Sequence, residues 1–160
     1  MLVIDTIDAV VMDVDGVLTD GTFLWDAEGN EQKRFNFLDV MGISLGKKAG
    51  LVFGLITGES TPFAGLFARK MGIAELHTGC KDKATALCLI AERQDIPLQN
   101  ICYIGDDIND LPAIELAGLS AAPANAHAQV LDRVDLILNS SGGQGAVREL
   151  VDHLLAKRKG

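Results

Sequence analysis

The chain is poor in positive charge: 14 lysine and arginine residues stand against 22 aspartate and glutamate residues, which gives a net charge of -8. This balance argues against a nucleic-acid backbone or an anionic membrane surface as the main partner. The sequence also lacks an apolar run long enough to span a bilayer, and its first residues lack the basic start and cleavage site of a signal peptide. We therefore expect a cytoplasmic protein that binds neither nucleic acid nor membrane.

Cysteine is scarce as well, and the three cysteines do not have the spacing of a metal site. Cys88 and Cys102 lie in apolar runs and are interpreted as small buried hydrophobic residues, whereas the sequence leaves Cys80 undetermined. A chain of 160 residues can bury a core without disulfide or zinc support. Because neither an internal repeat nor a low-complexity linker divides the chain, we expect a single domain over residues 1–160.

Apolar runs of strand length alternate with segments of helical period along most of the chain. This alternation predicts parallel strands joined by right-handed helical crossovers. The expected core strands span residues 9–13, 51–57, 75–78, 100–104, 119–122 and 135–138. The expected fold class is therefore α/β, a doubly wound, Rossmann-like parallel sheet.

Capping residues mark the ends of the expected helices. We expect Ser60 or Thr61 to cap a helix that has Pro62 in its first turn, since a hydroxyl can accept a hydrogen bond from an unpaired N–H group there. By the same rule, Asp82 is expected to cap the following helix. Gly72 falls where a helix C-cap would lie.

A different kind of element is expected between the first strand and the first helix. Residues 22–25 and 32–37 flank a turn-forming segment, and this pattern predicts a β-hairpin over about residues 21–37. We expect the hairpin to project from the sheet. The plainer alternative is a hairpin folded back on its own sheet.

Two aspartates, Asp13 and Asp15, stand where the first apolar run ends. Proteins of the α/β class place reactive groups at such strand ends. Two carboxylates at this spacing can share one divalent cation, and the first can attack a phosphorus atom while the second handles protons. Asp and Gly are also common turn residues, so the interpretation depends on the rest of the chain.

Three further polar pieces follow in the sequence: Thr57, Lys83 and the acidic segment 105–110. Taken singly, each has a plain alternative as a turn, a solvated helix residue or a calcium-binding fragment. In a doubly wound sheet, however, the carboxyl ends of neighbouring strands open onto one crevice, so residues distant in sequence can converge there. Phosphoryl transfer needs such a convergence, because positioned donors and cations must meet the charge on the phosphoryl oxygens.

The first two aspartates are assigned complementary roles in that chemistry. Asp13 is the expected nucleophile and forms an aspartyl phosphate that water later hydrolyses. Asp15 is expected to protonate the leaving alkoxide and then to deprotonate the attacking water, so it must start protonated and should have a raised pKa. A magnesium ion (Mg²⁺) is expected to be bound by Asp13, the backbone carbonyl of Asp15 and Asp106.

The phosphate is expected to bind to groups at the next strand end. The Thr57 hydroxyl and nearby backbone N–H groups, that of Gly58 among them, would contact its oxygens, helped by the positive end of a helix that opens at Ser60. Lys83 adds the formal cation. Asp110 is expected at least to cap the helix after its loop and to orient the metal ligand. The residues expected to support the metal ligands from behind are Asp107, Asn109 and Asp110.

With these residues identified, the chain resembles the haloacid dehalogenase superfamily of phosphatases over almost its full length. The combination of four motifs is highly specific. The matching segments are DVDGVLTDG (13–21), LITG (55–58), DK (82–83) and GDDIND (105–110).

A narrower resemblance is to the capless branch of that superfamily, which dephosphorylates 2-keto-3-deoxy sugar acids. It is based on the short hairpin in place of a cap domain, on RFNFLD at 34–39 and on GGQGAVRE at 142–149. The resemblance implies homotetramers whose hairpins assemble into a central barrel. It also implies that a neighbouring subunit closes each active site.

Two substrates compete within this branch. The 3-deoxy-manno-octulosonate 8-phosphate phosphatases usually carry an Arg where this chain has Glu59 and a Gly where it has Val40. Glu59 and Lys70 are instead similar to the pair with which the 2-keto-3-deoxynononate 9-phosphate phosphatases address the sugar acid, the Lys coming from a neighbouring subunit. An Arg that the nononate enzymes use would fall on Phe67. The prediction leans to the nononate 9-phosphate, with the octulosonate 8-phosphate as the alternative.

Glu59, Lys70 and Asp39 are accordingly the residues expected to contact the sugar acid. The plain alternative for the first two is an exposed acid at a helix N-terminus and an exposed helical base.

Two other functional classes are weighed against the phosphatase. A receiver domain also uses acids, a Thr and a Lys on a doubly wound sheet, but its acidic pair precedes the phosphorylated Asp, which is not the order found here. A catalytically retired oligomerisation domain is the other alternative, and the presence of every expected catalytic side chain argues against it.

The aromatic residues of the hairpin carry a separate prediction. We expect Phe23, Trp25 and Phe35 to contribute to contacts between subunits, since large exposed apolar patches are uncommon on monomers.

Overall fold

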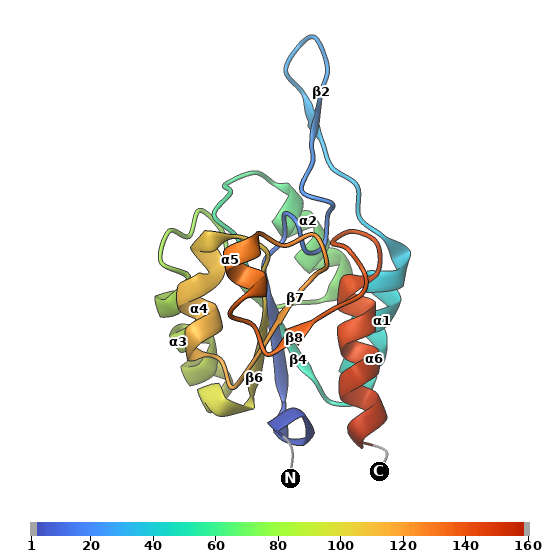
Figure 1. The fold of residues 1–160 in the computed structure, drawn as a ribbon. Coiled ribbons are helices and arrows are strands. Elements are labelled where there is room, and N and C mark those ends of the chain that lie inside the picture. The colour runs from blue at the N-terminus through green and yellow to red at the C-terminus, as the bar shows by residue number, and fades with distance from the viewer. Residues whose placement is uncertain (1–2, 159–160) are drawn as a thin grey trace.

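A six-stranded parallel sheet between two layers of helices forms the centre of the molecule (Figure 1). The computed structural model describes residues 3–158. Along the sheet the strand order is β5-β4-β1-β6-β7-β8, and every neighbouring pair is parallel. The strands are β1 (Ala9–Met12), β4 (Val52–Ile56), β5 (Glu75–His77), β6 (Ile101–Ile104), β7 (Leu119–Ala122) and β8 (Leu136–Ile137). The predicted α/β class and doubly wound sheet are confirmed.

The central strand β1 explains the position of the site. All four of its residues are buried, as expected for a strand covered by helices on both faces. The chain runs from β1 outward to β4 and β5, then returns to β6 on the other side, so the strand order reverses between β1 and β6. Met12 pairs with Leu55 on one side and Ile104 on the other, and the three strands end nearly level. Ligands bind at such a reversal point, outside the carboxyl ends of the strands.

The helices divide into two groups, each of which covers its own apolar cluster on the sheet (Figure 1). One face is packed by α1 (Phe37–Lys48), α2 (Phe63–Met71) and α6 (Ala146–Arg158), and the other by α3 (Lys83–Gln94), α4 (Leu111–Leu116) and α5 (Ala128–Leu131). Short 3₁₀ helices span Val3–Thr6, Leu98–Asn100 and Ile108–Asp110. None of the helices within residues 3–158 combines the length and apolar character that crossing a membrane requires.

The helix caps agree with the sequence in part. Asp82 caps α3, accepting a hydrogen bond from the backbone N–H of Thr85 at 3.0 Å, and Gly72 closes α2 in the left-handed conformation. The expectation that Ser60 or Thr61 caps α2 is wrong, because Pro62 occupies the N-cap position and makes no side-chain cap bond. Ser60 points instead toward the backbone of residue 79.

The hairpin rises away from the sheet, at the end where β1 finishes (Figure 1). Its ladder is short, with β2 (Leu24–Trp25) antiparallel to β3 (Glu31–Gln32). At the tip, the Asp26 carboxylate accepts hydrogen bonds from the backbone N–H groups of residues 28 and 30 and closes the turn. The projecting arrangement matches the prediction, whereas the strands are shorter than the segments expected from their apolar residues.

Candidate active site

The four predicted polar pieces converge at the carboxyl end of the sheet. Three of them line a cleft of about 310 Å³, and the fourth, Lys83, lies behind it. Asp13 follows β1 directly, Thr57 follows β4, and Asp106 lies in the loop after β6. Lys83 is the first residue of α3 and reaches in from behind. The cleft is lined by Asp13, Asp15, Gly21, Thr57, Gly58, Glu59, Lys81, Asp106, Asp107 and Asn109.

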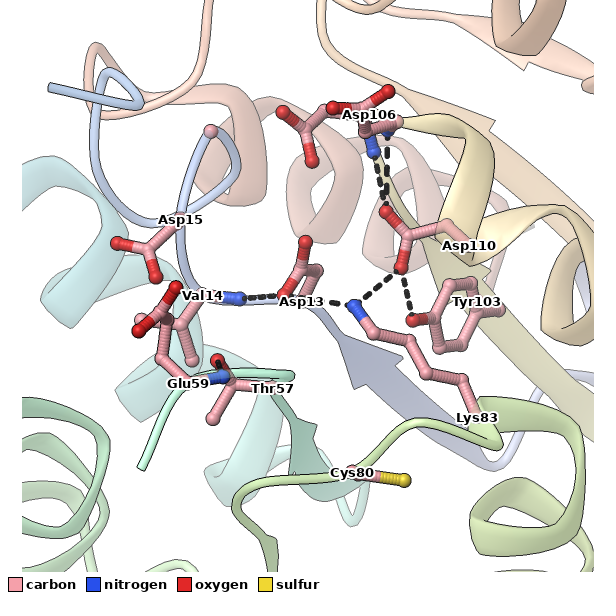
Figure 2. Close-up of polar contacts among 12 residues, drawn as sticks. Asp13, Val14, Asp15, Thr57, Glu59, Cys80, Lys83, Tyr103, Asp106 and Asp110 are labelled. Carbon is pink, nitrogen blue, oxygen red and sulfur yellow. Dashed lines mark hydrogen bonds and ion pairs between the residues drawn. The ribbon is translucent and has the colours of Figure 1, made fainter. Parts of the chain in front are cut away.

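A buried lysine lies between two carboxylates behind the cleft (Figure 2). The Lys83 Nζ is 3.1 Å from Oδ1 of Asp13 and 2.8 Å from Oδ1 of Asp110, and the lysine is only 2 % exposed. Burial alone would lower the pKa of Lys83, but the charges of Asp13 and Asp110 outweigh burial and raise it. The side chain is therefore a fixed ammonium directed at the predicted nucleophile.

Asp110 organises the loop after β6. Its Oδ1 also accepts a hydrogen bond from the Tyr103 hydroxyl at 2.6 Å, and its Oδ2 accepts the backbone N–H groups of Asp106 and Asp107 at 3.0 and 3.2 Å (Figure 2). Burial raises the pKa of Tyr103 well above its usual value, so the phenol remains a hydrogen-bond donor. The predicted role of Asp110 in orienting Asp106 agrees with this geometry, although its side chain makes no cap bond to α4.

The carboxylates at this site carry more negative charge than the protein neutralises. Oxygens of Asp13, Asp106 and Asp110 lie within 4.8 Å of one another, and Oδ1 of Asp106 is buried without a hydrogen-bond partner. Burial, followed by the charge of Asp110, raises the pKa of Asp13 well above its usual value and that of Asp106 to about 7. Mg²⁺ prefers oxygen ligands. Because both oxygens of Asp110 already accept hydrogen bonds, the carboxylates suited to bind such a cation are those of Asp13 and Asp106.

Gly16 allows the two halves of this site to approach each other. A Cβ at this position would lie 1.8 Å from Oδ2 of Asp106, and the residue has φ +84°, a conformation that favours glycine. Glycine at position 16 therefore lets the loop after β1 approach Asp106 without a clash or backbone strain.

The expected phosphate-binding residues lie on the opposite wall. Thr57 is 2 % exposed, and its hydroxyl oxygen accepts the backbone N–H of Glu59 at 3.2 Å, which holds the turn over residues 57–59. Gly58 and Glu59 both line the cleft. The helix expected to open at Ser60 starts only at Phe63, so its N-terminus is one turn farther along the chain than predicted.

Asp15 lines the cleft next to the hairpin. Its Oδ1 is 2.8 Å from the Nζ of Lys33, a residue between β3 and α1. No local pattern predicts this contact, because the two residues are 18 positions apart in the chain.

Asp39 lies outside the cleft. Its side chain is fully buried, and its Oδ1 accepts the backbone N–H of Arg148 at 3.1 Å, near the start of α6. Burial raises the pKa of Asp39 to about 6, against the opposing effect of that N–H group. The expectation that Asp39 contacts substrate is therefore not met, because the carboxylate joins α1 to α6 instead.

Lys70 is also absent from the cleft of its own chain. Its Nζ lies 5.5 Å from the ring centre of Phe37, in an apolar hollow beside the hairpin. Since the prediction gave Lys70 to a neighbouring subunit's site, its contact with substrate stays a prediction.

Sequence reasoning missed several residues of the site besides Lys33. Tyr103 is the one phenol in the chain and its position in an otherwise apolar strand was the available signal. Gly16 and Gly21 were part of a quoted motif without a role, and Lys81, which lines the cleft, was passed over beside Lys83.

Known proteins with similar sequences and folds are hydrolases and phosphatases, in agreement with the geometry of the cleft. A family model described as haloacid dehalogenase-like hydrolase matches residues 59–150. The 3-deoxy-D-manno-octulosonate 8-phosphate phosphatase of Escherichia coli K12 is 36% identical over 151 residues, which cover 94% of this chain and 80% of that protein.

Two solved structures have closely similar folds. The octulosonate 8-phosphate phosphatase of Moraxella catarrhalis, in complex with magnesium, phosphate and KDO, has a TM-score of 0.94 and 35% identity, covering 98% of this chain and 90% of that one. The cobalt-bound enzyme of Haemophilus influenzae has a TM-score of 0.95 and 34% identity, covering 99% and 92%. These relatives are named for the octulosonate 8-phosphate, so the leaning toward the nononate 9-phosphate is not supported.

Proposed function

Since this chain belongs to the haloacid dehalogenase-like hydrolases and is a phosphoric monoester hydrolase, we propose that it removes the phosphate from 3-deoxy-D-manno-octulosonate 8-phosphate. The observation that carries the proposal is the direct contact of a buried ammonium, Lys83, with the Asp13 carboxylate at the floor of the cleft. The 36% identity to octulosonate 8-phosphate phosphatases supports the substrate.

The first half of the reaction transfers the phosphoryl group to the protein. With the phosphate held by the Thr57 hydroxyl, the Gly58 N–H and Lys83, Asp13 attacks phosphorus and the bond to the sugar oxygen breaks. Asp15 gives its proton to that oxygen as it leaves. The protonated starting form of Asp15 stays a prediction.

The second half returns the enzyme to its starting state. Asp15, now a carboxylate, takes a proton from water, and the resulting oxygen attacks the phosphorus of the aspartyl phosphate. The bond to Asp13 breaks, and inorganic phosphate leaves. Lys83 remains an ammonium throughout and offsets negative charge on the phosphoryl group.

Mg²⁺ fits the same residues. When bound by Asp13, Asp106 and the backbone carbonyl of Asp15, it supplies the positive charge that the phosphoryl oxygens and the crowded carboxylates need. Asp107, Asn109 and Asp110 would then support these ligands, and the hydrogen bonds of Asp110 to the loop backbone favour that role.

The proposal extends to a homotetramer in which a neighbouring subunit covers each cleft. Exposed aromatic side chains on the hairpin, Phe23 at 50% and Trp25 at 66%, support such contacts. Phe35 differs, because its ring stacks on Phe67 of the same chain at 4.9 Å. The tetramer and the cytoplasmic location stay predictions.

Phosphate release tests the function directly. We expect the protein to hydrolyse the octulosonate 8-phosphate with Mg²⁺, to lose turnover with a chelator, and to prefer this substrate over the nononate 9-phosphate by roughly 10-fold or more in kcat/KM. Asp13→Asn should lose at least about 1,000-fold in kcat, because the nucleophile is gone. Turnover of neither sugar acid by the folded protein would favour the retired-domain alternative.

A parallel variant tests the substrate contact of Glu59. Because Glu59 lines the cleft where the octulosonate enzymes usually carry Arg, Glu59→Arg is expected to raise the preference for the octulosonate substrate. An unchanged ratio of the two kcat/KM values would mean that Glu59 does not contact the sugar acid.

A further inference from the structure

Lys33 reaches the cleft from the base of the hairpin. Its Nζ is 2.8 Å from Oδ1 of Asp15, the carboxyl that the proposed reaction uses to move protons. Glu31 offers a second carboxylate at 3.8 Å, and the ammonium lies 5.3 Å from the ring centre of Phe63. Two carboxylates and one aromatic face therefore surround this cation.

The burial of Lys33 separates this pair from an ordinary surface salt bridge. Its side chain is only 5% exposed, although Lys33 directly follows β3 of the projecting hairpin. Exposed ion pairs contribute little to stability, but burying an ammonium costs desolvation free energy unless the group has hydrogen-bond or ionic partners. Lys33 is therefore expected to stay bonded to Oδ1 of Asp15. This oxygen can accept the hydrogen bond whether Oδ2 of the same carboxyl carries a proton or not, so the contact is compatible with both forms of Asp15.

The hairpin strands fix the lysine in turn. The indole N–H of Trp25 donates to Oε1 of Glu31 across the ladder at 3.1 Å, and Oε2 of Glu31 faces Lys33. The contacts run from Trp25 through Glu31 and Lys33 to Asp15, so the hairpin is joined to the cleft of its own chain.

We propose that Lys33 is a positioning residue for the proton-transferring carboxyl of Asp15. It holds Oδ1, which orients the carboxyl so that Oδ2 can exchange protons with the leaving oxygen and later with water. This inference rests on the proposed phosphatase function and adds a role for the hairpin within one subunit.

If Lys33 positions Asp15, the effect of losing Lys33 should depend on the leaving group of the substrate. A sugar alkoxide is a poor leaving group and needs the proton from Asp15, whereas 4-nitrophenolate leaves as a stable anion and needs little help. The constant kcat/KM covers steps only up to departure of the leaving group, so hydrolysis of the aspartyl phosphate does not affect it. A misplaced Asp15 therefore lowers kcat/KM for the sugar phosphate far more than for 4-nitrophenyl phosphate.

The experiment compares Lys33→Met, Lys33→Arg and wild type on both substrates with Mg²⁺. Lys33→Met should lose roughly 10- to 100-fold in kcat/KM on the octulosonate 8-phosphate, and less than about 3-fold on 4-nitrophenyl phosphate. Lys33→Arg keeps the charge and should recover most of the loss. Lys47→Met is the matched control, because Lys47 bonds the carbonyls of Met71 and Gly72 far from the cleft, and it should retain both activities.

Equal losses on the two substrates, or no loss on either, would overturn the role of Lys33. Failure of the wild type on the sugar phosphate would count against the proposed function instead.

The ion pair can also be tested without turnover. In ¹⁵N spectra the Lys33 ammonium, assigned with Lys33→Met, should give a slowly exchanging signal that disappears in Asp15→Asn and persists in Asp13→Asn. An ammonium that exchanges quickly in the wild type would refute the contact.

Discussion

At the scale of single residues, surroundings determine what each carboxyl group can do. Asp13 and Asp39 are both buried, yet Asp13 faces an ammonium and the cleft, whereas Asp39 faces a backbone N–H group at the start of a helix. Residue type and motif were enough to predict Asp13. Asp39 was misassigned because a motif does not display the direction of a side chain, and its carboxylate points inward to α6.

Glu149 shows the opposite effect to burial and leads to a pH-dependent prediction. Partial burial by itself would raise its pKa, but hydrogen bonds from Asn139 and Ser140 outweigh burial and lower the pKa from 4.5 to about 2. A depressed folded-state pKa stabilises the protein above the unfolded value of 4.5, and this stability is lost as the pH falls toward about 2.

We expect Glu149→Gln to lower the free energy of unfolding by about 1–2 kcal/mol at pH 7, a figure discounted for solvent screening of the carboxylate. The difference from wild type should shrink as the pH falls through 4.5 toward 2, measured by urea unfolding. Glu92→Gln, at an exposed position of α3, is the control and should change little. A difference that stays constant with pH would contradict the assignment.

At the scale of elements, the segment before α6 supports the loop after β1. Gly142 packs so closely that a Cβ there would lie 1.9 Å from the carbonyl oxygen of Gly16. The backbone N–H of Gly143 donates to the carbonyl of Val17 at 3.1 Å, and Asn36 donates to the carbonyl of Gly143 at the same distance. The segment before α6 therefore helps to set the conformation of the loop after β1, which carries Asp13 and Asp15.

Gly142→Ala is expected to displace the loop that carries Asp13 and Asp15. Overpacking should destabilise the fold by about 1–3 kcal/mol, and kcat on the sugar phosphate should fall roughly 10-fold or more because the carboxyls move. Gly65→Ala in α2 is the control: its nearest neighbour is 4.0 Å away, so activity should persist. Full activity of Gly142→Ala would argue against this support.

Strands and helix ends could be predicted from the sequence where residues close together in the chain determine them. Buried apolar runs located the six strands, and a side-chain acceptor located the start of α3 at Asp82. The start of α2 was misplaced because Ser60 turns toward residue 79, a contact made across the loop rather than along the chain. The length of the paired strands in the hairpin was overestimated, because the apolar residues that flank the turn are not all hydrogen-bonded across the ladder.

At the scale of the whole molecule, the hairpin leaves apolar surface uncovered within residues 3–158. The rings of Phe23 and Trp25 lie 4.9 Å apart, tilted by 51°, and both are half or more exposed. The convergence of the site was predictable, since strand order places its residues at one edge. The homotetramer that the family resemblance implies stays a prediction, because it depends on surfaces that only a second chain can cover.

Replacing Phe23 and Trp25 together by Ser should break the assembly. We expect light scattering to show a tetramer for the wild type and a smaller species for the double variant, because the apolar contact area is lost. Leu89→Ser, at an exposed site on α3, serves as the control and should leave the mass unchanged. A wild type that is a stable, fully active monomer would contradict this prediction.

The four hydrogen bonds gathered by Asp110 have a consequence for heredity. The phenol of Tyr103, the ammonium of Lys83 and two backbone N–H groups all depend on this one carboxylate. One codon change there would disturb a strand, a helix and a loop together, whereas the Asp13 carboxylate contacts the N–H of its neighbour Val14 and the Lys83 ammonium. Without selection for catalysis, a lineage should accordingly tolerate substitution of Asp13 more readily than substitution of Asp110.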